Sequence, residues 1–147
     1  MRICVAKAVD DAEVLEAFSE MGHYEFAHGS EEEAYKYYQN YLDWEPENVD
    51  IIVLNRCAQK YFESGDYPRA LQAYLLLSKE FLSCRSLLGV AKSAIPLGQS
   101  RVAERALLKA NQLNKTEPLQ WGQITLLQLE LSMNFCWCSL HFIFVTT

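Results

Sequence analysis

Several kinds of sequence signal are missing from this chain of 147 residues. It contains no glycine-rich phosphate loop, no G-x-S-x-G and no H-E-x-x-H motif, so none of the common nucleotide, serine-hydrolase or zinc-protease sites is indicated. It also lacks the alternation of apolar and polar residues that marks a β-strand. Its formal net charge is −6, whereas nucleic-acid-binding proteins normally present a basic face to the phosphates. We therefore expect neither an enzyme nor a nucleic-acid-binding protein, and no cofactor or metal.

A secretory signal peptide is also missing. Asp10, Asp11 and Glu13 stand where such a peptide would need an apolar stretch. The chain has five cysteines, and an odd number of cysteines without a signal peptide is typical of a reducing compartment. We therefore expect a cytoplasmic protein, or one in a space continuous with the cytosol.

Charge is distributed unevenly along the chain. Residues 1–50 contain 13 acidic and 3 basic side chains, a net charge of −10. Residues 51–147 contain 6 acidic and 10 basic side chains, a net charge of +4. Two interpretations are open: the asymmetry orients a partner in the field of the protein, or the charges form an ordinary solvated surface.

The strongest signal in the sequence is an internal repeat. A similar ten-residue segment occurs three times, at residues 29–38, 65–74 and 98–107. Each copy has a glycine at its start and an alanine five residues later, and the successive alanines are 36 and 33 residues apart. A period close to 34 residues is typical of a helix–turn–helix repeat. The three pairs are Gly29 and Ala34, Gly65 and Ala70, and Gly98 and Ala103.

The residues within each period resemble the tetratricopeptide repeat, whose pattern is W-x2-L-G-x2-Y, then A-x3-F, then P. The second helix of a unit carries an alanine followed four residues later by a tyrosine, as in Ala34 and Tyr38 or Ala70 and Tyr74. The resemblance implies an all-α fold, a right-handed α-solenoid of stacked antiparallel helix hairpins. It implies an N-terminal extension at 1–10, a repeat domain at 11–131 and a tail at 132–147, with repeats at about 15–48, 51–83 and 84–117 and a partial repeat at 118–131.

Local signals place seven helices within these repeats. A small residue such as Gly22 is expected where two helices of a hairpin press together. Ser30 and Glu33 have the spacing of a capping box, and Asp66 is expected to cap another helix. The glycine after each first helix is expected to end it in the left-handed conformation, and Pro96 should shorten the helix that contains it. The predicted helices cover about 11–28, 31–44, 51–63, 67–81, 84–97, 100–113 and 117–131.

The first helices are expected to line a concave face that binds a peptide or helix of a partner. Residues spaced by four and then three share one helical face, and here that face has a polar row beside an apolar row. Such a surface can hydrogen-bond a partner backbone while it buries partner side chains. The alternative is that Phe26, Phe62 and Ile95 fill the core between repeats. The predicted partner-binding residues are Ser19, His23, Phe26, Asn55, Arg56, Gln59, Phe62, Arg85, Leu88, Lys92 and Ile95.

The tail at 132–147 contains no aspartate, glutamate, lysine or arginine. Three interpretations of the tail are open. In the first, the tail folds over the last helix or contacts a partner, which can be a second copy of the chain that stacks on this end. In the second, the tail replaces the continuation of a longer solenoid. In the third, it anchors the chain in a membrane. A span needs about 20 apolar residues, but the apolar run 131–145 has 15 and includes Asn134 and His141. Cys136, Cys138 and His141 have no second ligand cluster, so no metal site is expected.

These observations favour a protein-interaction adaptor or scaffold within a larger complex. Tyrosine-rich second helices and the start of the last helix, Pro118-x2-Trp121-Gly122, are similar to ciliary and axonemal repeat proteins, which gives an alternative within the same class. An alternative of another class is a repeat protein tethered to a membrane by its tail. The expected partner is a protein, with no nucleic acid and no membrane.

Overall fold

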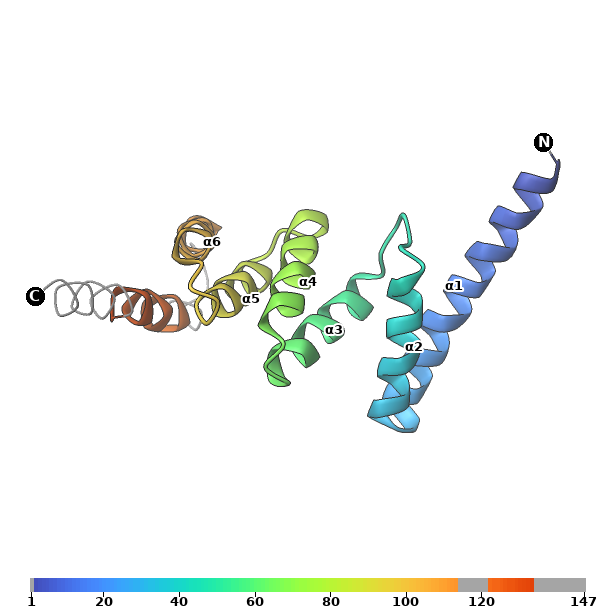
Figure 1. Cartoon of the computed structure of the whole chain (residues 1–147), viewed down its shortest axis with the longest axis horizontal. Coiled ribbons are helices and arrows are strands. Elements are labelled where there is room, and N and C mark those ends of the chain that lie inside the picture. Colours follow the sequence, from blue (N-terminus) through green and yellow to red (C-terminus); the bar gives the residue numbers. More distant parts are fainter. Residues whose placement is uncertain (1, 114–121, 134–147) are drawn as a thin grey trace, which may run out of the picture. The chain divides into compact units, whose positions relative to one another are not determined.

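The computed structural model describes residues 2–113 and 122–133, with side chains from residue 11 onward, and every regular element in this part is a helix (Figure 1). The chain divides into two compact units, residues 1–57 and 58–147, with the division inside the third helix. A further helical stretch covers residues 122–133. The six labelled helices are α1 (Arg2–His28), α2 (Glu31–Asp43), α3 (Ile51–Glu63), α4 (Tyr67–Glu80), α5 (Cys84–Ala94) and α6 (Ser100–Leu113).

Most helix boundaries agree with the sequence within a residue or two. Two differ more. Helix α1 begins at Arg2, so the segment predicted as an extension is continuous with the first helix. Helix α5 ends at Ala94, three residues before the predicted end, because Pro96 has no N–H to continue the hydrogen-bond ladder. The start predicted for the last helix, at 117, lies outside the described residues, as does the tail from residue 134.

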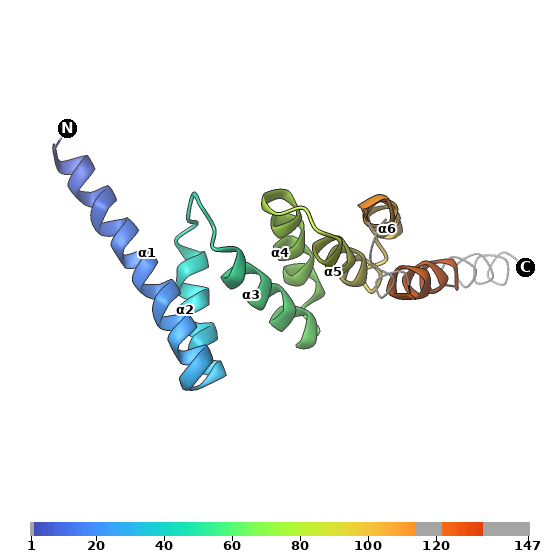
Figure 2. The same ribbon diagram turned by 180° about the vertical axis from the view of Figure 1, so that it is seen from behind.

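In the first unit, α1 and α2 lie side by side as an antiparallel hairpin (Figures 1 and 2). Their contact depends on Gly22: a Cβ atom there would lie 2.4 Å from Cε1 of Tyr38, closer than packed carbon atoms approach. Tyr38 and Ala34 have no exposed surface. The predicted close approach at Gly22 is therefore confirmed.

The second unit has a core of small and aliphatic side chains. It joins α4, α5, α6 and the stretch 122–133. Here too a glycine meets a tyrosine, because a Cβ atom on Gly89 of α5 would lie 2.4 Å from Cδ1 of Tyr74 on α4. The sequence pattern had not singled out Gly89. The fully buried members of this core include Ala91, Ala94, Ala103 and Ala110.

The helix ends correct two sequence predictions. The Ser30 side chain makes no capping bond, and the Glu33 carboxylate pairs with Lys36. The predicted capping box is therefore not formed at the start of α2. Gly29 does not adopt the left-handed conformation, whereas Gly65 and Gly98 do, with φ of 80° and 70°.

Two other helix starts have caps, one predicted and one not. The Asp66 carboxylate accepts a hydrogen bond from the backbone N–H of Arg69, as predicted. A capping box that the sequence had not indicated occurs at Ser83 and Ser86. Along the described helices, none combines the length and apolar character needed to cross a bilayer.

Candidate functional site

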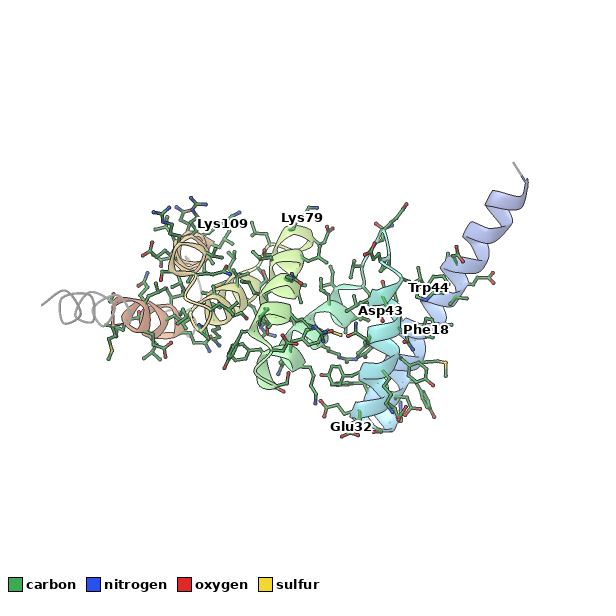
Figure 3. All side chains as sticks on the ribbon, in the orientation of Figure 1. Phe18, Glu32, Asp43, Trp44, Lys79 and Lys109 are labelled. Atoms are coloured by element: carbon green, nitrogen blue, oxygen red, sulfur yellow. The ribbon has the colours of Figure 1, made fainter. Side chains whose placement is uncertain are left out.

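A groove of about 860 Å³ lies within the first unit. One wall is a face of α1, on which Leu15, Ser19 and His23 follow one another at intervals of four residues. The other wall is the end of α2 and the connection from residue 44 to residue 50. Figure 3 shows Phe18 on α1 and Trp44 at the C-terminal end of α2. We call this feature the α1 groove.

Tyr41 holds the connection in place. Its side chain is buried, and its hydroxyl donates to the carbonyl of Asn48 at 3.2 Å and accepts from the N–H of Asp50 at 2.8 Å. Glu45, within the same connection, has a left-handed φ of 47°, a conformation that non-glycine residues seldom adopt. The wall of the groove is therefore fixed by specific bonds, despite its lack of regular structure.

The lining of the α1 groove combines apolar and acidic side chains. Leu15, Pro46 and Val49 are half-buried, and Trp44 is 49% exposed. Among the residues whose side chains the structure describes, the lining contains no lysine or arginine. Its carboxylates are Asp11, Glu16, Glu20, Glu45, Glu47 and Asp50.

A hydrogen-bonded polar cluster lies at the inner end of the α1 groove. His23 Nε2 is 3.0 Å from Oδ2 of Asp50, and His23 Nδ1 is 2.9 Å from the hydroxyl of Tyr38 and 3.1 Å from Nη1 of Arg56. Because a guanidinium only donates, Nδ1 must accept, and the imidazole proton belongs on Nε2, facing Asp50. Arg56 also donates to the Tyr38 hydroxyl. The cluster therefore connects the Arg56 guanidinium on α3 to the Asp50 carboxylate through the Tyr38 hydroxyl and the His23 ring.

Asp50 has two roles in this cluster. Its Oδ2 accepts from the Ser19 hydroxyl at 2.9 Å, while its Oδ1 accepts from the backbone N–H of Ile52 at 2.8 Å at the start of α3. Burial alone would raise the pKa of the Asp50 carboxyl, but the bonds from His23, Ser19 and the backbone outweigh burial and lower the pKa. The ionised carboxylate therefore fastens α1 to the first turn of α3.

Arg56 is held by aromatic rings as well as by polar atoms. Its guanidinium carbon lies 3.8 Å from the centre of the Phe26 ring, within the range of a cation–π contact. Burial raises the pKa of the Tyr38 hydroxyl, against a smaller opposing effect of the Arg56 charge. Tyr38 is thus a neutral hydrogen-bonding group at neutral pH.

The structure brings together four of the predicted partner-binding residues, and all four belong to the first unit. Ser19 is 9% exposed and His23 is half-buried, so both are occupied mainly with Asp50 and Tyr38. Phe26 and Arg56 contact each other. Asn55, which directly precedes Arg56 in α3, is half-buried.

The other predicted residues belong to the second unit. Leu88 is 4% exposed and is part of the core, so it does not offer a binding surface. Ile95 packs against the same core, in line with the alternative that it fills core, and Phe62 packs against the ring of Tyr67. The polar members are more accessible: Gln59 and Arg85 are exposed and Lys92 is half-buried.

Sequence reasoning missed the residues that complete the site. Asp50 stands directly before the apolar start of α3, so its capping role was readable, but its bonds to α1 were not. Tyr38 occupies the large position of the A-x3-F pattern, which predicts packing and says nothing of a polar partner. Trp44 and the acids of α1 lie outside the first-helix stripe that the repeat pattern emphasises.

A second hollow, of about 760 Å³, lies in the second unit between α6 and the stretch 122–133. Its described lining combines three leucines, Leu107, Leu108 and Leu131, with four polar or charged residues, and Leu108 is 62% exposed. Among the described side chains, no group of three histidine, cysteine or acidic residues is arranged to hold a metal ion. Cys136, Cys138 and His141 lie outside the described residues.

Comparison with known proteins supports the repeat. The sequence matches the family model of the cilia and flagella-associated protein 70 C-terminal domain, a tetratricopeptide-repeat domain, over residues 4–132. A search of curated proteins finds no match to the sequence.

Solved structures give the same fold. The C-terminal tetratricopeptide-repeat domain of an FK506-binding protein from Plasmodium falciparum has a TM-score of 0.62 at 22% identity and covers 84% of this chain and 94% of that one. PcrH from Pseudomonas aeruginosa has a TM-score of 0.56 at 20% identity, with coverage of 82% and 91%. PcrH in complex with the chaperone binding region of PopB has a TM-score of 0.56 at 19% identity, with coverage of 80% and 94%.

These neighbours confirm the predicted fold class, an all-α solenoid of the tetratricopeptide type. At such identities they show the fold alone. The family match covers most of the sequence, and the chain therefore belongs to the cilia and flagella-associated protein 70 C-terminal domain family of tetratricopeptide-repeat proteins.

Proposed function

We propose that this domain is a protein-interaction module that holds a peptide or helix of another protein, as an adaptor or scaffold within a larger assembly. Its family and fold support this role, because stacked helix hairpins present extended surfaces that such proteins use for binding. One structural neighbour, PcrH, has been solved with the chaperone binding region of PopB. The proposed mechanism is binding alone, and no chemical step is assigned to the chain.

The observation that carries the proposal is the α1 groove. It is an open hollow of about 860 Å³ with apolar side chains on both walls and polar side chains among them. A partner segment can exclude water from Leu15 and Trp44 while it pairs with polar groups at the rim, the arrangement found in protein interfaces.

We extend the proposed binding surface to the first helices α3 and α5. Its polar members there are Asn55, Gln59 and Lys92, with Arg85 beside them. Leu88 is omitted from this surface because its side chain is buried in the core. The extended surface follows from the repeat pattern, in which first helices of successive hairpins line one face.

One triple variant tests the extended surface. Asn55→Ala, Gln59→Ala and Lys92→Ala together should abolish capture of a partner from isolated cilia, measured by cross-linking and mass spectrometry. The matched control replaces one asparagine, one glutamine and one lysine on second helices, Asn40, Gln72 and Lys79, all of which are exposed (Figure 3 labels Lys79). If both triples capture the same partners as the unmodified chain, the surface on α3 and α5 is wrong.

The proposed place of action is a ciliary or axonemal assembly. Its support is the family description, which names cilia and flagella. The tagged chain should be found in cilia of ciliated cells and should remain with axonemes after detergent removes the ciliary membrane. Release into the detergent fraction would favour a membrane tether, and absence from cilia would contradict the ciliary proposal.

A further inference from the structure

We propose that the α1 groove accepts a basic amphipathic segment of a partner protein. Such a segment has lysine or arginine side chains on one face and apolar side chains on the other. This inference rests on the proposed function and gives its partner a chemical class.

The first step is the charge of the lining. Among the side chains described from residue 11 onward, six carboxylates border the α1 groove and no lysine or arginine does. None of the six is paired with a described lysine or arginine, and Asp50 is bonded to the ring of His23. Carboxylates gathered in a hollow with low-dielectric walls raise the local concentration of cations. The groove therefore selects for positive charge.

The second step is the apolar part of the lining. Trp44 exposes 49% of its surface at the rim, and Leu15 and Val49 are half-buried beside it. A small hydrated cation gains nothing from this surface, whereas an apolar side chain of a peptide would be desolvated there. An exposed indole also attracts a lysine or arginine that crosses its face. A cationic peptide with an apolar stripe fits both parts of the lining.

Other ligands fit less well. Phosphate-rich partners such as nucleic acids and anionic lipid surfaces would be repelled by the carboxylates. No group of three ligating side chains in the described part of the chain is arranged for a divalent ion. The charge and the apolar stripe together favour a protein segment.

The test uses the full chain and a fluorescent synthetic helix of about 16 residues, long enough to be partly helical alone. Its lysines occupy one face and its leucines the other. Two control peptides replace lysine by glutamate or leucine by alanine. Fluorescence anisotropy should show binding of the lysine–leucine peptide, at least about tenfold weaker binding of the alanine peptide, and none of the glutamate peptide.

Variants of the chain locate the site. Glu16→Lys with Glu20→Lys should weaken binding at least about tenfold, since both carboxylates line the groove. Glu13→Lys with Glu80→Lys changes the net charge equally, and both residues are exposed and outside the groove, so affinity should stay within about twofold. Trp44→Ala should also weaken binding, and circular dichroism should show that each variant keeps its helices.

Three results would overturn the inference. The control pair could weaken binding as much as the groove pair, which would mean diffuse electrostatic attraction. The lysine–leucine and lysine–alanine peptides could bind equally, which would mean that the apolar lining takes no part. Sedimentation could show that the chain associates with itself and that Glu16→Lys with Glu20→Lys abolishes this, which would mean that a second copy occupies the groove.

Failure here is distinguishable from failure of the proposed function. If no basic peptide binds but the triple variant at Asn55, Gln59 and Lys92 still abolishes partner capture, the interaction role stands and only the partner class is wrong. If no basic peptide binds and the triple variant captures partners normally, both are wrong.

Discussion

Tyr38 and Tyr74 occupy the same position of the repeat, yet their surroundings differ. Tyr38 is completely buried, and its hydroxyl bonds to His23 and receives a bond from Arg56. Tyr74 is half-buried against Gly89, and within the described residues its hydroxyl has no hydrogen-bond partner. The pattern therefore specifies a ring packed on a small residue, while neighbouring residues decide whether the hydroxyl joins a polar cluster.

The difference shows how the helices within each unit are held together. The first unit joins its helices through a charged and hydrogen-bonded cluster, which depends on several partners at once. The second unit relies on alanine, leucine and glycine packing, which depends on shape. Substitutions at matched positions should therefore cost more in the first unit wherever polar atoms or immobile rings are involved.

The largest expected effect follows from adding volume at the two glycines. Gly22→Val should lower the free energy of unfolding by about 3 kcal/mol, because the buried Tyr38 ring cannot move away. Gly89→Val should cost about 1 kcal/mol, because the half-buried Tyr74 ring can turn outward. Urea unfolding with hydrogen exchange of each unit measures both. Equal costs would contradict the contrast between the tyrosines.

Removal of the two hydroxyls should give the next largest difference. Tyr38→Phe should cost about 1.5 kcal/mol, since it removes a partner from both His23 and Arg56. Tyr74→Phe should change stability by less than about 0.5 kcal/mol, since no bond is lost. Thermal unfolding at neutral pH compares them. A large loss for Tyr74→Phe would reveal a partner that the structure does not describe.

Asp50 adds a pH dependence to the first unit. Because its folded-state pKa is lowered, the folded protein binds fewer protons at this carboxyl than the unfolded chain does. Its stabilisation is fully present above the unfolded pKa of about 3.9 and is lost as pH falls through the lower folded value. Asp50→Ala should cost about 1 kcal/mol at pH 7, because α3 loses its cap, and progressively less as the pH falls through the folded-state pKa of Asp50.

The measurement is the unfolding midpoint of both proteins between pH 2 and pH 7. Asp66→Ala is a suitable control, because Asp66 caps α4 in the second unit and receives no bond from a histidine. A difference between Asp50→Ala and the unmodified chain that does not shrink in acid would mean that the carboxylate is not the source of the stability.

The sequence predicted most of the fold because its signals are local. Helical periodicity, the glycine–alanine spacing and Pro96 are each read within a few residues, and the helices follow them closely. The polar cluster was not predicted: Ser19, His23 and Arg56 were expected to bind a partner, whereas their bonds to Asp50 and to one another depend on how α1 meets the start of α3. Hydrogen bonds of this kind, between residues far apart in the sequence, produce no periodic pattern in the sequence.

The acidic lining was overlooked for a related reason. Its carboxylates come from α1 and from an irregular connection, and only the fold of the first unit brings them to one hollow. Leu88 was predicted to line a binding surface but is buried in the core, because a helical face beside the core stripe can turn inward by a small rotation.

Helix caps give the smallest expected effect and the sharpest comparison of local pattern with structure. Ser83→Ala should cost about 1 kcal/mol, because the Ser83 hydroxyl accepts from the N–H of Ser86 at 3.1 Å and the Ser86 hydroxyl accepts from the N–H of Ser83 at 3.2 Å. Ser30→Ala should change stability by less than about 0.5 kcal/mol, since Ser30 is exposed and makes no side-chain cap.

The sequence alone predicts the reverse order, because Ser30 with Glu33 has the capping-box spacing and Ser83 has no acidic or amide partner three residues on. Chemical denaturation of the two variants decides between the orders. Ser83→Gly is the control for the hydroxyl: it should lose only a few tenths of a kcal/mol, since glycine at a cap leaves the backbone N–H groups open to water. If Ser30→Ala proves the more costly variant, the start of α2 is capped by its serine after all, and the local pattern would be the better guide there.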